Sequence, residues 1–258
     1  MKLSSTGHII YPLLISALLV MATPAWAKDV IRVAFSEHPP WKTLLKNGVH
    51  GGIDLELVRL VAKRMNLDVE FVHYPFKRSL KMVEVGDIDI MTGVFHRPER
   101  ETMFYYIQPA YKKSSDKAFF VLKGHELHVE RHEDLRSLSI GTTLGSKYYP
   151  AFDEDQTIEK HPVSNADLNV KMLQAGRIDA FIMTESTGDF LITKHGQADN
   201  IVKLKYAYRS PQSVYIVLSK VSPLAKRQNE FNKVMQDLIN EGTMEKLKKQ
   251  FYQSMRPR

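Results

Sequence analysis

The 258-residue sequence contains no cysteine. This absence excludes disulfide bonds, a cysteine nucleophile and a lipid-modified cysteine, so the stability of the fold must come from burial of its core. The motifs Gly-x-Ser-x-Gly and His-Glu-x-x-His, which mark two classes of hydrolase, are also missing. Tryptophan is scarce, with Trp26 and Trp41 as its two occurrences.

Long apolar runs are lacking as well. The run over residues 13–22 is shorter than the roughly 20 residues that a transmembrane helix needs. Lys2 supplies a positive start, and residues 23–27 end in an Ala-x-Ala pattern. These features predict a signal peptide over residues 1–27, cleaved after Ala27, that leaves 258 − 27 = 231 residues. Without an anchoring cysteine, we expect the exported chain to reside in the periplasm of a Gram-negative bacterium.

The formal net charge is +7. Nucleic acid is the obvious partner of a basic chain, but these basic residues do not cluster as a nucleic-acid surface requires. The densest basic run, residues 246–249, lies on a predicted amphipathic helix and forms a solvated face. We therefore expect no nucleic-acid partner; a basic chain can instead favour small anionic ligands.

An internal repeat indicates two similar halves. Residues 81–89 (KMVEVGDID) return 90 positions later as residues 171–179 (KMLQAGRID). In each copy a helix ends at a glycine, which accepts the left-handed φ that closes a helix, and Ile-Asp begins an apolar strand. Two such copies predict two lobes of like construction with a groove between them.

Strands and helices are expected to alternate along the chain. The predicted strands span residues 30–35, 68–73, 90–92, 118–122, 138–141, 180–184 and 213–218. The predicted helices span residues 53–65, 76–85, 165–175, 223–241 and 244–251, with Ser164 or Asn165, and Ser222, as N-caps. This order predicts an α/β fold whose sheets are mixed, mainly parallel and flanked by helices.

Two polar breaks interrupt the apolar periodicity, at residues 111–117 and 208–212. Each indicates a crossing between the lobes. The sequence therefore predicts that lobe 1 comprises residues 28–112 and 213–258 and that lobe 2 comprises residues 113–212. In sheets of this type, ligands bind beyond the carboxyl ends of the strands.

Four stretches resemble the bacterial extracellular solute-binding proteins of family 3, the polar amino acid-binding components of ABC importers. They are residues 52–58 (GIDLELV), residues 86–89 (GDID) with 98–100 (PER), residues 176–180 (GRIDA), and residues 231–232 (FN) with 241–243 (EGT). The resemblance covers nearly all of the chain after the leader. It implies the type II periplasmic-binding-protein fold, a clamp that closes on an amino acid or related carboxylate for a membrane permease. We expect a monomer that needs no cofactor and no metal.

The family pattern assigns ligand contacts in lobe 1. Its arginine that pairs with the ligand's carboxylate corresponds to Arg100, whose planar guanidinium suits a carboxylate. Thr92 and Gly93 match the strand end that faces the ligand, and His38 and Trp41 match the aromatic loop that stacks on it. Without the resemblance, Arg100 is a surface arginine and Trp41 a loop-packing residue.

Further candidates follow in lobe 2. Ser146 matches a second carboxylate site at a helix N-terminus, where free N–H groups favour an anion, or it is a simple N-cap. Thr184 stands where amino acid-binding members usually carry an aspartate for the α-ammonium group. Glu185 would replace that aspartate only after a one-residue shift, which turns a strand residue to the other face. Recognition of an α-amino group therefore stays open, and Arg78 is a candidate second cation near Arg100 or part of a solvated helix face.

Two other functional classes remain open at this stage. The same fold carries enzymes such as periplasmic cyclohexadienyl dehydratases, and it also serves stand-alone ligand sensors. The histidines His125, His128 and His132 form a spaced trio with neighbouring glutamates, which can be read as a metal site. We expect this trio to face solvent instead, because short motifs of this kind often arise by chance.

Overall fold

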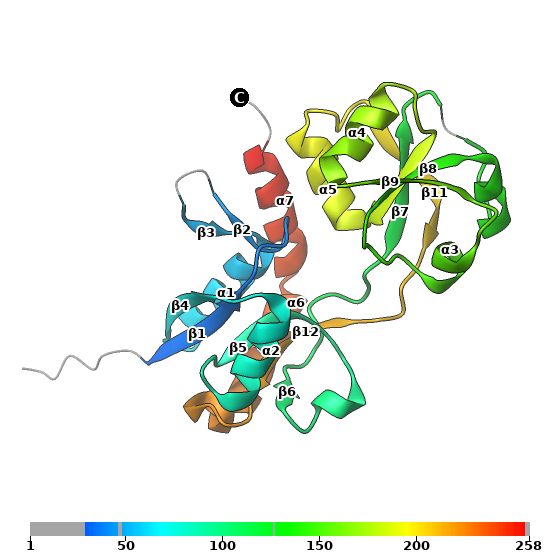
Figure 1. Cartoon of the computed structure of the whole chain (residues 1–258). Helices are drawn as coiled ribbons and strands as arrows, with labels where there is room; N and C mark the ends of the chain where they lie inside the picture. Colours follow the sequence, from blue (N-terminus) through cyan, green and yellow to red (C-terminus); the bar gives the residue numbers. More distant parts are fainter. Residues whose placement is uncertain (1–28, 46–47, 126, 256–258) are drawn as a thin grey trace, which may run out of the picture.

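The computed structural model describes residues 29–45, 48–125 and 127–255, and it forms the predicted two-lobed α/β fold (Figure 1). The predicted signal peptide over residues 1–27 lies outside the described residues. Lobe 1 is built on a sheet of order β4-β1-β5-β12-β6, and lobe 2 on a sheet of order β11-β7-β10-β8-β9. Among the helices of the described residues, none is long and apolar enough to cross a bilayer.

The sheet of lobe 1 contains β1 (Val30–Phe35), β4 (Asp68–His73), β5 (Ile90–Phe95), β6 (Phe104–Tyr106) and β12 (Val214–Ser219). Strands β4, β1 and β5 run parallel, whereas β12 runs antiparallel to β5 and β6. Its helices are α1 (Ile53–Arg64), α2 (Phe76–Val85), α6 (Gln228–Asn240) and α7 (Thr243–Met255), with the 3-10 helices η1 (Pro98–Arg100) and η3 (Pro223–Arg227). A hairpin of β2 (Thr43–Leu44) and β3 (His50–Gly51) lies beside α1.

The sheet of lobe 2 contains β7 (Lys117–Leu122), β8 (Ser139–Thr143), β9 (Glu159–Val163), β10 (Ala180–Thr184) and β11 (Ile201–Tyr208). Strands β9, β8 and β10 run parallel, and β7 runs antiparallel to β10 and β11. The helices are η2 (His132–Ser137), α3 (Pro150–Glu154), α4 (Ala166–Gln174) and α5 (Glu185–Lys194). Separate apolar clusters fill the two faces of each sheet.

Several predicted elements are confirmed residue for residue, among them the strands 30–35 and 68–73 and the helix 76–85. Asn165 caps α4 and Ser222 caps η3, as predicted. The predicted helix 223–241 is instead divided into η3 and α6. The prediction missed α5, whose sequence ESTGDFLITK is rich in poor helix formers and carries only a weak apolar stripe.

The repeated Gly-x-Ile-Asp places an aspartate just before a strand in both lobes, and its carboxylate accepts a hydrogen bond from the backbone of a neighbouring strand. This arrangement is here named the strand lock. In lobe 1, Oδ2 of Asp89 accepts a hydrogen bond from the Arg32 backbone N–H at 2.7 Å. In lobe 2, Oδ2 of Asp179 accepts one from the Ser139 N–H at 2.8 Å. The two aspartates thus tie neighbouring parallel strands together in separate sheets, which is the outcome that the repeat predicts.

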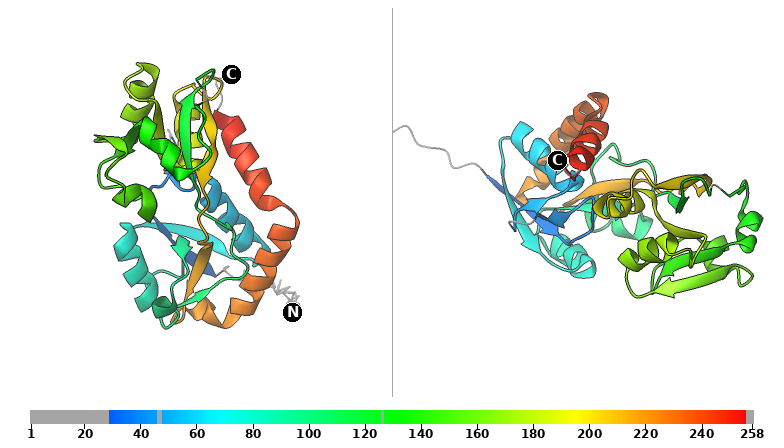
Figure 2. Two further views of the ribbon diagram at one scale, coloured as in Figure 1. Left: turned by 90° about the vertical axis from the view of Figure 1, so that its right-hand side faces the viewer. Right: turned by 90° about the horizontal axis from the view of Figure 1, so that it is seen from above.

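The two crossing segments meet between the lobes. Lys112 and Val214 form an isolated antiparallel bridge, in which the Val214 N–H donates to the Lys112 carbonyl at 2.9 Å. The two segments run together between the lobes (Figure 2), and helix α7 of lobe 1 contacts α5 of lobe 2 (Figure 1). The lobe boundaries at 112/113 and 212/213 stay predictions.

We expect Asp89→Ala to lower the free energy of unfolding by about 2–4 kcal/mol, because Asp89 is 2 % exposed and also binds the Arg32 guanidinium and the Ser222 hydroxyl. Asp179→Ala, at an exposed copy of the same lock, should cost only about 0.5–1.5 kcal/mol. Urea unfolding followed by circular dichroism measures both. Equal losses in the two variants would contradict this account.

Candidate functional site

The loop over residues 38–43 reaches the cleft because α1 begins against it. The N–H of Asp54, in the first turn of α1, donates to the Trp41 carbonyl at 2.8 Å. Gly52 precedes this helix with φ 112°, and a Cβ at this position would lie 2.4 Å from the Trp41 carbonyl oxygen. Glycine is therefore required for the loop to pack this closely on the helix start.

A cavity of about 520 Å³, here named the lobe 1 cavity, opens beside this loop. Basic side chains contribute strongly to its lining: His38, Lys42, Arg97, Arg100 and Lys112. Aromatic rings also line it: Trp41, Phe76, Phe95 and Tyr111. The lining therefore combines positive charge with flat apolar surface, the composition of a small-ligand pocket.

A second cavity of about 270 Å³, the interlobe cavity, adjoins the first at Trp41 and Lys112. Lobe 2 contributes Thr184, Glu185, Ser186 and Asp189, and α7 contributes Lys248 and Tyr252. Ser186 joins the lobes directly, because its hydroxyl accepts from Trp41 Nε1 at 3.0 Å and its carbonyl accepts from the Tyr252 hydroxyl at 2.9 Å. The two cavities are thus neighbouring parts of one cleft.

Lys42 is a buried cation without an ion pair. Its side chain is 3 % exposed, and Nζ donates to the Thr92 carbonyl at 3.4 Å. Within the described ranges, no carboxylate lies within ion-pair distance of it. Burial lowers the pKa of Lys42, and the negative charge of Asp54 opposes that shift.

Lys112 lies on the first crossing segment with its Nζ 3.7 Å from the centroid of the Trp41 ring. Burial lowers the pKa of Lys112 from 10.5 to about 8. Asp54 opposes the shift, whereas Lys248, Lys117 and Lys42 add to it. The Trp41 face partly replaces lost hydration, since an aromatic face attracts a cation.

Asp54 is the acid whose charge acts on both lysines. It is 1 % exposed, and its Oδ2 accepts from the Tyr111 hydroxyl at 2.9 Å. Burial and the Asp54 charge raise the pKa of Tyr111 well above its usual value, so this hydroxyl keeps its proton. Partial removal from solvent, together with Lys42 and Lys112, lowers the pKa of His38.

The three acids that line the interlobe cavity, Asp116, Glu185 and Asp189, all have cationic partners. Glu185 and Asp189 share Lys203, at 2.6 Å and 3.1 Å. Asp116 pairs with Arg209 at 2.7 Å. Glu185 is the first residue of α5 and does not continue strand β10. The expectation that its side chain points to the opposite face from Thr184 holds only for successive strand residues, so it does not apply here.

The structure brings most of the predicted contacts together in the cleft. His38, Trp41, Gly93 and Arg100 line the lobe 1 cavity, while Thr184 and Glu185 line the interlobe cavity. Thr92 is fully buried and contributes its carbonyl to the environment of Lys42. Their contacts with a ligand stay predictions.

Two predicted contacts lie elsewhere. Ser146 is exposed and lines neither cavity, and the predicted helix start at this residue is wrong, because α3 begins only at Pro150. A turn closed by the Ser146 N–H and the Thr143 carbonyl at 3.0 Å occupies this segment. Arg78 is exposed, lines neither cavity, and lies 4.9 Å from the centroid of the Tyr74 ring.

The sequence reasoning missed Lys42, Lys112 and Ser186. A usable signal existed for Lys42, which directly follows Trp41 in the aromatic loop. Lys112 lies in a polar break that the sequence marks only as a crossing. Ser186 lies on the unrecognised helix α5, so its position in the cleft was not foreseen.

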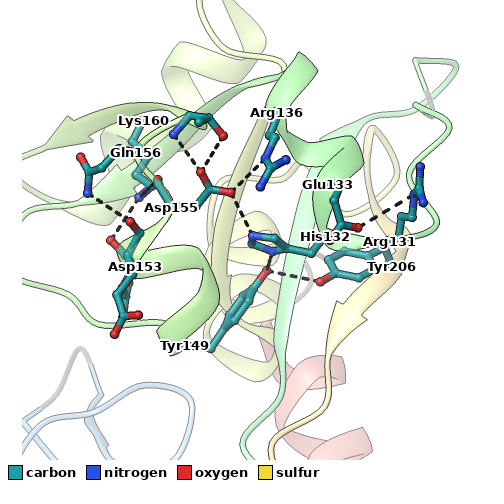
Figure 3. Close-up of polar contacts among 12 residues, drawn as sticks. Arg131, His132, Glu133, Arg136, Tyr149, Asp153, Asp155, Gln156, Lys160 and Tyr206 are labelled. Atoms are coloured by element: carbon teal, nitrogen blue, oxygen red, sulfur yellow. Dashed lines mark hydrogen bonds and ion pairs between the residues drawn. The ribbon is translucent and has the colours of Figure 1, made fainter.

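The histidine trio does not assemble. The prediction that His132 faces solvent is wrong. Its Nδ1 lies 3.2 Å from the Tyr149 hydroxyl, and its Nε2 lies 3.3 Å from Oδ2 of Asp155 (Figure 3). These contacts tie η2 to both ends of α3, where Tyr149 precedes the helix and Asp155 follows it, and none of the three residues lines either cavity. No metal-binding cluster of three ligands occurs in the part of the chain that the structure describes.

Comparison with known proteins supplies the family. The family model of "Bacterial extracellular solute-binding proteins, family 3" matches residues 31–254. The chain belongs to this family. It is similar to the "Probable amino-acid-binding protein YxeM" of Bacillus subtilis, with 22 % identity over 80 % of this chain and 78 % of that protein. It is also similar to the "Putative amino-acid ABC transporter-binding protein PatH" of Vibrio harveyi, with 22 % identity over 90 % and 92 %.

Among solved structures, the chain resembles substrate binding domain 2 of Lactococcus lactis GlnP in its open conformation. The TM-score is 0.71 at 21 % identity, and the match covers 90 % of this chain and 97 % of that domain. This likeness shows the fold. The protein is therefore an extracellular solute-binding protein of family 3 with a two-lobed, type II periplasmic-binding-protein fold.

We expect Lys112→Met to raise the free energy of unfolding by about 1–3 kcal/mol below pH 8. Below its folded-state pKa of about 8, the folded protein holds a lysine cation that burial disfavours. The gain should shrink as the pH rises from 8 towards 10.5, where the unfolded chain also loses this proton. Urea unfolding at pH 7, 8, 9 and 10 tests this, with Lys113→Met as an exposed neighbouring control. A gain in stability that is independent of pH would show that the folded protein does not bear the cost of a desolvated Lys112 cation.

Proposed function

We propose that this protein captures a small polar solute, an amino acid or a related carboxylate, and delivers it to an ABC permease from the periplasm. The proposal rests on the observation that both lobes line one cleft. Within it, Trp41 of lobe 1 donates a hydrogen bond to the hydroxyl of Ser186 in lobe 2. A solute that contacts both lobes stabilises the closed arrangement more than the open one, because closure completes its contacts.

Arg100 is the proposed carboxylate ligand in lobe 1. It follows β5 on η1, lines the lobe 1 cavity, and has no ion-pair partner among the described residues. A guanidinium that is already paired would be a poorer ligand, because binding would first have to break that pair. The flat face of Trp41 then supplies apolar contact for the body of the solute.

The protein is proposed to act by binding rather than conversion, as a monomer without cofactor or nucleic acid. The relatives that it matches are named as binding proteins. Glu185 shares Lys203 with Asp189, and His38 lines the other cavity, so these two groups do not form an acid–base pair. An enzyme on this fold would be revealed by conversion of the ligand in the experiment below.

Arg100→Ala should weaken the binding of a carboxylate ligand at least ~30-fold, because loss of a desolvated charge pair costs about 2–5 kcal/mol. A thermal-shift screen of amino acids and small carboxylates selects the ligand, and calorimetry measures its Kd. Arg177→Ala is the matched control, since Arg177 is exposed and lines neither cavity. An unchanged Kd for Arg100→Ala would remove Arg100 from the site.

Trp41 fluorescence should change when the ligand binds, because the indole lies where the two cavities meet. Trp26, the other tryptophan, falls in the predicted signal peptide and is absent from processed protein. The ligand should be recovered chemically unaltered after prolonged incubation. A converted product at steady turnover would replace the binding proposal by an enzymatic one.

A further inference from the structure

We propose that the cleft selects a small organic dianion, with two carboxylates on a partly apolar skeleton, over zwitterionic and cationic amino acids. This inference rests on the proposed function, because it specifies the solute of the same cleft. Three independent features support it: the charge balance of the lobe 1 cavity, the pairing of the acids across the cleft, and the shape of the lining.

The charge balance of the lobe 1 cavity is positive. Two lysines and two arginines line it, namely Lys42, Lys112, Arg97 and Arg100, and two acids do, namely Glu37 and Asp54. The formal sum is 4 − 2 = +2 with His38 neutral. A ligand with two negative charges would neutralise this excess, whereas a cationic amino acid would increase it.

Three of these cations are not neutralised by a neighbour. Arg97 lies 3.8 Å from Glu99, but Lys42, Arg100 and Lys112 have no carboxylate within ion-pair distance in the described segments. Desolvation of two of them is reflected in the lowered pKa values of Lys42 and Lys112. Burying a charge without a partner is costly, so a binding anion would supply the missing partner and be stabilised in turn.

On the opposite face, each carboxylate that lines the interlobe cavity already has a cationic partner. Lys203 pairs with Glu185 and Asp189, and Arg209 pairs with Asp116. Thr184 Oγ1 accepts from Lys117 Nζ at 2.7 Å, which leaves its O–H proton free to donate. Ser186 Oγ likewise accepts from Trp41 Nε1 and keeps its own proton to donate. Both hydroxyls can therefore donate to an acceptor on the ligand.

The lining distinguishes an organic dianion from an inorganic one. The lobe 1 cavity of about 520 Å³ is much larger than a phosphate or sulfate ion requires. Its rings, Trp41, Phe76 and Phe95, bind no inorganic anion well but pack against a carbon skeleton. The expected ligand thus places carboxylates near the cations and its skeleton against the rings.

The test compares probes that differ in charge at similar size. Calorimetry at pH 7 uses succinate, glutarate and phthalate as dianionic probes, with L-glutamate, L-glutamine, L-arginine and inorganic phosphate as comparisons. We expect at least one of the three dianions to bind at least tenfold more tightly than every comparison. Tighter binding of any comparison than of all three dianions would overturn the proposal, as would no binding of any dianion.

Charge variants test whether the named lysines carry the selectivity. Lys42→Met and Lys112→Met should each weaken dicarboxylate binding at least tenfold. Lys113→Met, an exposed neighbour with the same change of net charge, should not weaken it. If all three variants weakened dicarboxylate binding equally, the preference would follow from the net charge of the whole protein, and the proposal would be overturned. Should Lys42→Met fail to fold, Lys112→Met, at the less buried position, decides the question.

The outcome separates this inference from the proposed function. If L-glutamine or L-arginine binds tightest and changes Trp41 fluorescence, the protein is a solute-binding protein and only the dianion inference fails. If a probe is converted to product, or binds without any dependence on Arg100 and Trp41, the proposed function itself fails.

Discussion

The cleft depends on one backbone contact, the hydrogen bond from the Asp54 N–H to the Trp41 carbonyl. It satisfies a helix-start donor that would otherwise lack a partner, and it requires the close approach that Gly52 permits. Because the loop is held there, the Trp41 ring is directed towards lobe 2 and the Lys42 side chain into lobe 1. Asp54 also remains beside the two lysines whose charge it partly balances.

The rigid parts of the molecule and its adjustable part are formed by different interactions. Within each lobe, an aspartate of the repeat ties parallel strands together, through a partly buried hydrogen bond in lobe 1 and an exposed one in lobe 2. Between the lobes, the described contacts include the hydrogen bonds to Ser186 and the contact of α7 with α5, and the Lys112–Val214 bridge joins the two connecting segments. Such a division allows the lobes to move as units about their connections, which is the hinge form of domain closure.

The sequence predicted the fold well because the fold depends on local signals. Apolar periodicity, the glycine helix stops and the caps at Asn165 and Ser222 are all readable within a few residues. Arg100, Trp41 and Thr184 could be located only because a family pattern supplied their neighbours. The helix start predicted at Ser146 was wrong because a proline four residues later starts the helix, and a glycine turn precedes it.

Lys42 and Lys112 were harder to find, because their properties depend on the whole structure. Nothing in the sequence around Lys112 distinguishes it from Lys113, yet one lies over the Trp41 ring and the other is exposed. Nor does the sequence show that Lys203 and Arg209 neutralise the acids of lobe 2. A count of charges along the chain gives a basic protein; the pairing of those charges in space leaves the excess in the cleft. Since a buried, unpaired lysine weakens the empty protein, its presence at the cleft is most simply explained by an anion that binds there.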